Sequence, residues 1–139
     1  GNGTEMWSFD GNVSNGSITL DHPVSKAQVG LPIEADLQTL PVTLEAAPSL
    51  GVGYVKNIAK VFMRVYRSSG IFIGPSFDQL TEFKSRTTEP YGSPPNLLTE
   101  EIEQPLKTTW QSDGTVCIRQ KAPLPLTIQT MSLEVSVGG

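Results

Sequence analysis

Apolar and polar residues alternate with a period of two along much of the chain, which is typical of strands with one buried face. In the first such run, Val29–Leu37, the apolar residues occupy the odd positions. From Leu40 onward they occupy even positions, and this one-residue change predicts a bulge or bend near Gln38–Thr39. Pro32 and Pro41 cannot donate hydrogen bonds to a sheet, so the run predicts an edge or interrupted strand.

The middle of the chain fits two patterns. Residues 54, 58, 61 and 65 form a helical stripe, whereas residues 61, 63 and 65 form a strand face. The β-branched and aromatic residues of Lys56–Arg67, followed by the turn signal Ser68–Gly70, favour strand, turn and strand. Ser76–Gln79 has capping-box spacing, which is compatible with one short helical turn. Glu89–Pro105 reads as a long irregular loop.

The last third of the chain is also predicted to be β structure. The turn signal Ser112–Gly114 precedes Val116–Ile118, and two alternating runs follow with a change of parity before Met131. Asp10–Gly11 and Asn15–Gly16 indicate hairpin turns. The eight or nine short strands predict an all-β fold, an antiparallel β-sandwich or barrel-like domain with long irregular loops.

The same alternation predicts a core, and changes of composition predict boundaries. A shift near Asp21 divides the chain into residues 1–21, an N-terminal β-hairpin segment, and residues 22–139, the main β domain. The start, Gly1–Thr4, has no initiator Met, basic region or apolar run, so we expect a piece of a longer protein. The side chains predicted to be buried are Val29, Leu31, Ile33, Val61, Met63, Val65, Val116, Ile118, Leu126, Leu133 and Val135.

Composition supports a single turn-rich domain and gives no direct indication of function. The chain has 139 residues, of which 37% are hydrophobic and 17% charged. A chain of this length and composition can bury a hydrophobic core, and a highly charged disordered tail is excluded. Thirteen glycines and eleven prolines indicate many turns and few long helices. A net charge of -4 does not favour nucleic acid or an anionic membrane as a partner.

Few residues are suited to catalysis or to metal binding. The one histidine, His22, lies in a predicted exposed turn, and the one cysteine, Cys117, lies between apolar residues that favour inert packing. Asp10–Asp21 imitates a calcium loop, but its bend position holds Asn15 and its twelfth residue is not Glu. Gly51–Lys56 lacks the Gly-Lys-Ser/Thr end of a phosphate loop. We therefore expect no catalytic, cofactor-binding or metal site.

Charged residues form two clusters. The first is a basic stripe of Lys56, Lys60, Arg64 and Arg67, which could contact phosphates. The interpretation that we favour is one polar face of a strand, because the domain is acidic overall and has no second basic cluster. The second cluster is acidic, and the sequence predicts a solvated loop for its residues, Glu100, Glu101 and Glu103.

Four blocks in a fixed order resemble one known family. They are VGLPIEADLQTLPV (Val29–Val42), RVYRSSGIFIGP (Arg64–Pro75), GSPPNLLTEE (Gly92–Glu101) and DGTVCIRQKAPLPLTIQTMSLEVSVGG (Asp113–Gly139). Together they are similar to the C-terminal region of the tail nozzle proteins of short-tailed bacteriophages or prophages, of the tail tubular protein B type. Residues before Ile18 resemble the end of the small β-module that precedes this region. Most matched positions shape the backbone, such as Gly30, Pro32, Gly70, Gly74, Pro75 and Pro125.

The resemblance implies a structural role in the phage tail. Such proteins form a six-fold ring below the portal and adaptor, contact other tail proteins, and continue the channel through which DNA is ejected. They have no cofactor and no enzymatic activity, and the resemblance transfers no catalytic residue. The expected location is the virion, after assembly in the cytoplasm of the bacterial host. The isolated chain is expected to be monomeric or weakly associated, to pass DNA without holding it, and not to insert into a membrane.

Two other classes of function are retained for comparison. One is a receptor-binding or glycan-binding β module of a phage tail, for which Trp7, Tyr91 and Trp110 are the candidate residues. The other is a hydrolytic accessory domain, which the single His and the missing metal-ligand set disfavour.

Overall fold

The computed structural model describes residues 8–43, 54–84 and 96–138, and all statements below concern these residues. They contain strands and turns but no helix, so the predicted all-β class is confirmed. The choice between sandwich and barrel stays a prediction. The seven strands are β1 (Ala35–Gln38), β2 (Val55–Val65), β3 (Phe72–Gly74), β4 (Thr81–Glu82), β5 (Glu101–Pro105), β6 (Cys117–Gln120) and β7 (Ile128–Gly138).

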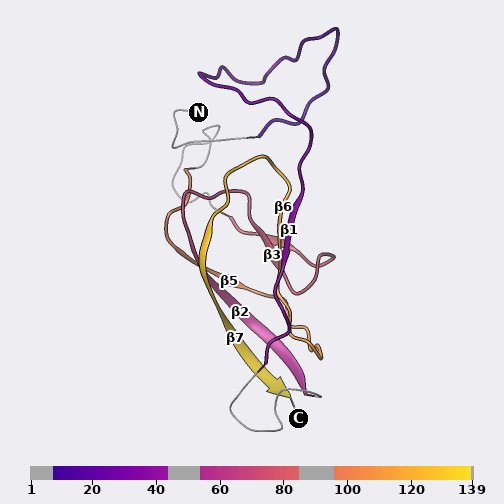
Figure 1. Cartoon of the computed structure of the whole chain (residues 1–139), viewed down its shortest axis with the longest axis vertical. Coiled ribbons are helices and arrows are strands. Elements are labelled where there is room, and N and C mark those ends of the chain that lie inside the picture. The colour runs from indigo at the N-terminus through magenta and orange to yellow at the C-terminus, as the bar shows by residue number, and fades with distance from the viewer. Residues whose placement is uncertain (1–7, 44–53, 85–95, 139) are drawn as a thin grey trace.

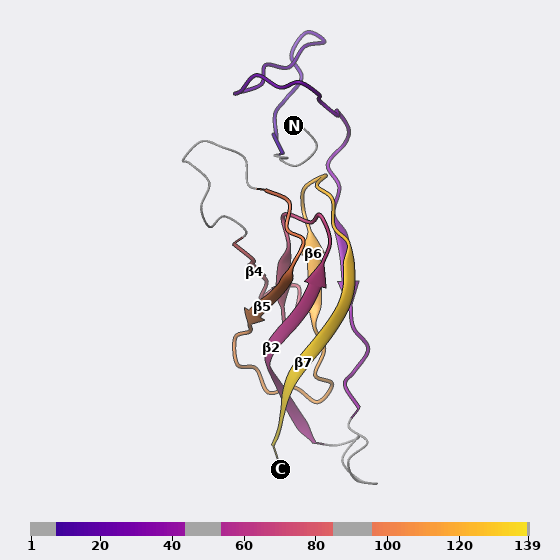
Figure 2. The ribbon, with the colours of Figure 1, turned by 90° about the vertical axis from the view of Figure 1, so that its left-hand side faces the viewer.

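The strands form two antiparallel sheets, which Figures 1 and 2 show from two directions. One sheet has the order β1-β6-β3-β4, and the other has the order β5-β2-β7. Buried side chains from both sheets form a single apolar cluster, with Val61 and Met63 from β2 and Ile73 and Ile118 from the four-stranded sheet. The sheets therefore stabilise each other by burying their apolar faces against a shared core.

Strand β2 resolves the ambiguity between helix and strand in the middle of the chain. The pairing with β7 shifts between Ile58 and Lys60, so Ala59 is an extra residue in β2. A bulge of this kind changes the parity of the buried positions. The buried apolar side chain at position 58 is therefore followed by buried side chains at positions 61, 63 and 65. The three-residue step from Ile58 to Val61, which fitted a helical stripe in the sequence, is a β-bulge.

Strand β7 explains the second change of parity. Val65 pairs with Ile128 and Arg64 pairs with Thr130, which leaves Gln129 as the extra residue. The partly buried positions accordingly shift from Ile128 to Met131. The change of parity predicted from the sequence before Met131 is therefore a register shift in the sheet.

The prediction for the first strand was partly wrong. The ladder begins only at Ala35 and ends at Gln38, and β1 is the edge strand that the prolines predicted. The predicted interruption at Gln38–Thr39 coincides with the end of β1. Beyond it, Thr39 donates its amide N–H to the carbonyl of Val116, and the Val116 amide donates to Thr39 Oγ1 at 2.9 Å. These contacts hold the chain beside β6 without a regular ladder.

A polar corner carries the chain from the end of β2 to β3 in the other sheet. Gly70 has φ 69°, a conformation that glycine adopts without strain. The hydroxyl of Ser68 is fully buried and accepts the amide N–H of Thr127 at 2.9 Å. The predicted order of strand, turn and strand is correct, but the two strands lie in different sheets and do not form a hairpin.

Two predictions for the loops need correction. The predicted loop Glu89–Pro105 ends in a strand, because β5 pairs with β2 from Lys60 to Arg64. Residues 89–95 of this segment lie outside the described residues. At Ser76–Gln79 the structure has a turn closed by a hydrogen bond from the Gln79 amide to the Ser76 carbonyl, at 3.1 Å, and no helical turn.

The predicted core is right for the two sheets and wrong for the segment before them. Val61, Met63, Val65, Val116 and Ile118 are at most 1% exposed, as the alternation predicted. Leu126, Leu133 and Val135 are partly buried against the same cluster. In contrast, Val29, Leu31 and Ile33 are 80%, 90% and 51% exposed, so their alternation does not mark a face buried within this chain.

Candidate functional site

The segment before β1 carries exposed apolar side chains that no other part of the described residues covers. Residues 23–33, here called the arm, have no strand partner among the described residues. Figures 1 and 2 show residues 8–33 beyond the end of both sheets. Val29, Leu31 and Ile33 alternate with Gly30 and Pro32, so an extended chain presents these three apolar side chains on one face. Monomeric proteins rarely expose contiguous apolar patches of this kind without a partner.

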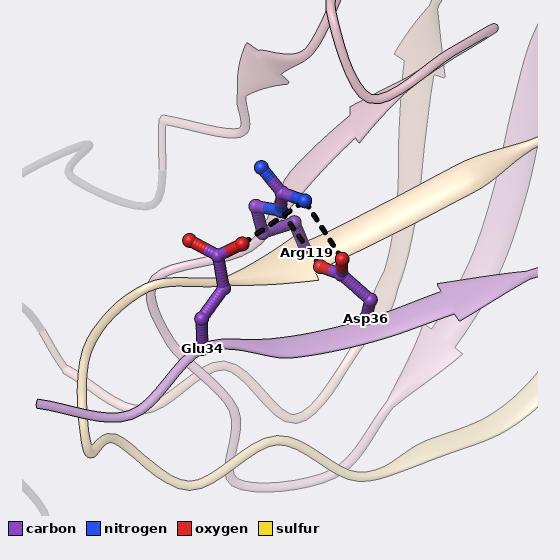
Figure 3. Close-up of polar contacts among 3 residues, drawn as sticks. All are labelled: Glu34, Asp36 and Arg119. Carbon is purple, nitrogen blue, oxygen red and sulfur yellow. Dashed lines mark hydrogen bonds and ion pairs between the residues drawn. The ribbon is translucent and has the colours of Figure 1, made fainter.

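A clasp of charged residues fixes the junction between the arm and β1. Asp36 lies directly opposite Arg119 of β6, and its two carboxylate oxygens accept hydrogen bonds from Arg119 Nε and Nη2, both at 2.7 Å. Glu34 Oε1 lies 3.0 Å from the same Nη2, as Figure 3 shows. The guanidinium carbon stands 4.9 Å from the centre of the Phe77 ring, close enough for a cation–π contact. Bidentate geometry of this kind fixes orientation as well as charge.

The clasp shifts the protonation equilibria of its members. The hydrogen bond from Arg119 lowers the pKa of Asp36, an effect that partial burial opposes and the positive charge reinforces. The same hydrogen bond raises the pKa of Arg119. Because the pKa of Asp36 is depressed on folding, its ion pair stabilises the fold above the unfolded pKa. That contribution is lost as the pH falls through the lower folded pKa.

An NMR titration of the Asp36 carboxyl carbon should therefore give a midpoint below the ordinary value of 3.8. In Arg119→Gln the midpoint should rise toward that value, because the hydrogen bonds that favour the carboxylate are lost. Lys60→Gln serves as the control and should leave the midpoint unchanged, since Lys60 pairs with Glu103 in the other sheet. Equal midpoints in the parent chain and Arg119→Gln would contradict the clasp.

An open groove lies beside the clasp, between the edges of the two sheets. Its volume is about 260 Å³, and β1, β6 and the start of β7 contribute to its wall. Both β1 and β7 are edge strands, so this side of the core is covered by no further strand within the described residues. We call it the edge groove, and its lining residues are Ala35, Asp36, Leu37, Ile118, Leu126 and Ile128.

The predicted basic stripe does not form one surface. Lys56 precedes the bulge in β2 and is therefore on the buried side, 2% exposed, with its Nζ donating to the carbonyl of Ser112 at 2.9 Å. Lys60 and Arg64 follow the bulge and alternate with the buried positions 61, 63 and 65, which places them on the opposite face. Arg67 lies in the corner after β2, with φ 45°. The favoured interpretation as one polar strand face was wrong, because it did not include the bulge.

Acidic residues flank the two cations on the outer face of β2. Lys60 Nζ lies 2.6 Å from Glu103 Oε1, and this hydrogen bond raises the pKa of Lys60. Glu101 is the register partner of Arg64 on β5, and Glu134 is the register partner of Lys60 on β7. Three carboxylates thus neighbour two cations. Glu101 and Glu103 belong to a strand and not to the predicted loop, although Glu100 lies just outside it.

The two residues considered for catalysis, His22 and Cys117, lie in different parts of the fold, one at a bend before β1 and one in β6. His22 is exposed at a bend, and Asn15–Gly16 forms the predicted turn, with positive φ at both residues and a bridge from Ser14 to Ser17. Cys117 is buried, and this burial raises the pKa of its thiol. Within the described residues no three His, Cys, Asp or Glu side chains lie close enough to hold a metal ion. In the same part of the chain, no helix has the length and hydrophobicity needed to span a bilayer.

Of the three aromatic residues considered for glycan binding, the structure describes one. Trp110 is 51% exposed, and its ring lies beside Gly138, where a β-carbon would be 3.0 Å from Cζ3. Trp7 and Tyr91 lie outside the described residues. Within the described residues, the candidate aromatic set thus comprises one half-exposed ring, that of Trp110 at the end of β7.

Sequence reasoning missed the clasp and the edge groove. Arg119 is 83 residues from Asp36, and no local pattern connects them. One signal was present, because acidic residues at positions 34 and 36 share a face of an extended strand and favour a basic partner across the sheet. Comparison of the chain with models of known protein families and with curated proteins finds no match.

Proposed function

We propose that this chain is a structural module of the tail nozzle of a short-tailed bacteriophage, where it helps to form the channel for DNA ejection. The observation that carries the proposal is the set of four ordered sequence blocks that resemble this family. Three of them contribute to the framework of the fold: Val29–Val42 includes β1, Arg64–Pro75 includes the polar corner and β3, and Asp113–Gly139 includes β6 and β7. Similarity in framework residues bears more directly on the fold than on a site, so the assignment to a nozzle rests on the resemblance of the four blocks.

The charges on the outer face of β2 support a conduit rather than a DNA-gripping module. Each phosphate neutralised by Lys or Arg releases counterions and strengthens attachment to DNA. Here Lys60 is already paired with Glu103, and Glu101 lies in register with Arg64. A phosphate that approached these cations would also meet the flanking carboxylates. In the proposed nozzle, such a surface lets DNA pass and does not hold it.

Fluorescence anisotropy with a short DNA duplex across a salt series tests this proposal. At physiological salt we expect a dissociation constant far weaker than micromolar, because the flanking acids neutralise the cations. Glu101→Gln combined with Glu103→Gln should strengthen low-salt binding, with a slope of log K against log salt up to about -2 for two phosphate contacts.

The reverse variant, Lys60→Glu with Arg64→Glu, is the matched control and should change little in the parent background. Micromolar or tighter affinity of the parent chain at physiological salt, abolished in this control, would contradict the conduit. It would make the chain a DNA-binding module.

A further inference from the structure

We infer that the arm of one copy of this chain occupies the edge groove of a second copy. The two surfaces are complementary because both are largely aliphatic. The arm offers three aliphatic side chains on one face, and the groove offers a wall with Leu37, Ile118, Leu126 and Ile128. This inference goes beyond the proposed function, since it stands on the arm and the groove alone and applies to any assembly of this chain.

The backbone of the arm suits the addition of one strand to an open edge. In an extended chain, residues of one parity direct their N–H and C=O groups to the same side. Val29, Leu31 and Ile33 therefore share one hydrogen-bonding edge, whereas Pro32, which has no N–H, lies on the other. From Ser25 to Ile33 the arm therefore has one edge on which no proline interrupts the N–H donors. Edge strands β1 and β7 leave open edges on both sides of the groove.

The arm does not fill the groove of its own chain. Glu34, the residue between the arm and β1, is held by Arg119 at 3.0 Å, so the backbone enters β1 in line. Figures 1 and 2 show the segment before β1 leading away from the sheets. To reach its own groove, the chain would have to reverse direction at the residue that the clasp fixes. A second copy supplies the same arm without that reversal.

Charge favours the same pairing. Lys26 is the only charged residue of the arm. On the β1 side of the groove, Glu34 and Asp36 together face a single guanidinium, that of Arg119. The β1 border of the groove therefore carries one more carboxylate than guanidinium, and this excess of acid favours a basic arm.

The area of the contact sets its expected strength. Covering three aliphatic side chains with an equal groove surface removes on the order of 500 Å² from water, and stable stand-alone interfaces need about 1,000 Å² or more. One arm in one groove is thus a weak contact between isolated chains, and it becomes strong where an assembly raises the effective concentration. Because donor and acceptor surfaces differ, the contact is heterologous and can close into a ring.

Disulfide trapping tests the contact. Leu31→Cys chains are mixed with isotopically labelled Leu126→Cys chains under mild oxidation, and mixed dimers are counted by mass. Glu82→Cys is the matched control acceptor, because it is exposed on β4 at the opposite edge of the sheet. The native Cys117 is buried and does not compete. We expect at least tenfold more mixed dimers with Leu126→Cys than with Glu82→Cys. Equal yields would overturn the proposal.

Two further variants separate this contact from the alternatives. Adding Val29→Asp to the Leu31→Cys chain should lower the mixed-dimer yield at least fivefold and leave the unfolding midpoint unchanged, since Val29 is 80% exposed. An unchanged yield would contradict the role of the apolar face. A chain that carries both Leu31→Cys and Leu126→Cys should form disulfides between copies. A disulfide formed between the two introduced cysteines of one chain would show that the arm occupies the groove of its own chain. Neither result depends on the DNA measurement.

Discussion

Met63→Ala is expected to lower the free energy of unfolding by about 2–5 kcal/mol. Met63 is 1% exposed and is one of the largest fully buried side chains of the described residues. It lies in the centre of β2, opposite Met131 on one side and Ile102 on the other, so its removal leaves a cavity between both neighbours. Domains have a total stability of about 5–15 kcal/mol, so this loss is a large part of the whole.

Urea unfolding followed by circular dichroism measures this effect, with Leu31→Ala as the matched control. Leu31 is also a large apolar residue in an alternating run, but it is 90% exposed. Its replacement should change the free energy of unfolding by less than about 0.5 kcal/mol, as expected for surface positions. Similar losses in the two variants would show that the arm packs on its own domain, against the fold described above.

Gly74→Ala is expected to destabilise the protein by about 3 kcal/mol, an effect large for the addition of one methyl group. A β-carbon at Gly74 would overlap the carbonyl oxygen of Gln79 and lie 2.8 Å from its carbonyl carbon. These are backbone atoms of the turn after β3, so no side-chain rotation relieves the overlap. Overpacking of this kind usually costs about 1–3 kcal/mol, and a rigid backbone neighbour places Gly74 at the upper end.

The control for Gly74→Ala is the same substitution at Gly30. No atom lies within 4 Å of a β-carbon built at Gly30, which is in the arm. Gly30→Ala should therefore be neutral or stabilise slightly, because alanine restricts the unfolded chain. A difference of less than about 0.5 kcal/mol between the two variants in urea unfolding would contradict the close approach of β3 to the Ser76–Gln79 turn.

The sequence predicted the class of fold because alternation is a local property of strands. The three-residue step from Ile58 to Val61 and the parity change before Met131 are visible in the sequence, but only the pairing with the neighbouring strand shows that Ala59 and Gln129 are the extra residues. For the same reason the sequence did not predict that Lys56 is buried while Lys60 is on the outer face. A single bulge inverts the face of each residue that follows it.

The candidate site was harder to predict than the core. Alternation at Val29–Leu37 shows that one face of the segment is apolar, but it does not show which surface covers that face. We assumed a surface of the same chain, and the structure leaves Val29 and Leu31 exposed. The clasp depends on Arg119, which is far from Glu34 and Asp36 in sequence. Contacts of this range are set by topology, which single-sequence patterns do not specify.

The exposed arm and the acid-flanked cations have a common interpretation in the proposed nozzle. An arm that packs on a neighbour would join subunits around a channel, and cations neutralised within their own sheet would leave passing DNA free. The outer face of β2 combines Lys60 and Arg64 with Glu101, Glu103 and Glu134, so its net charge is negative. Assembly and passage of DNA would then use different surfaces of the same small domain.

Electron cryomicroscopy of the tailed particle to which we propose that this chain belongs tests the central claim most directly. We predict density that fits the two sheets at six positions in one ring below the portal and adaptor, around the channel axis. Absence of the chain from the particles would contradict the nozzle assignment. So would a copy number other than six, or a location on receptor-binding fibres.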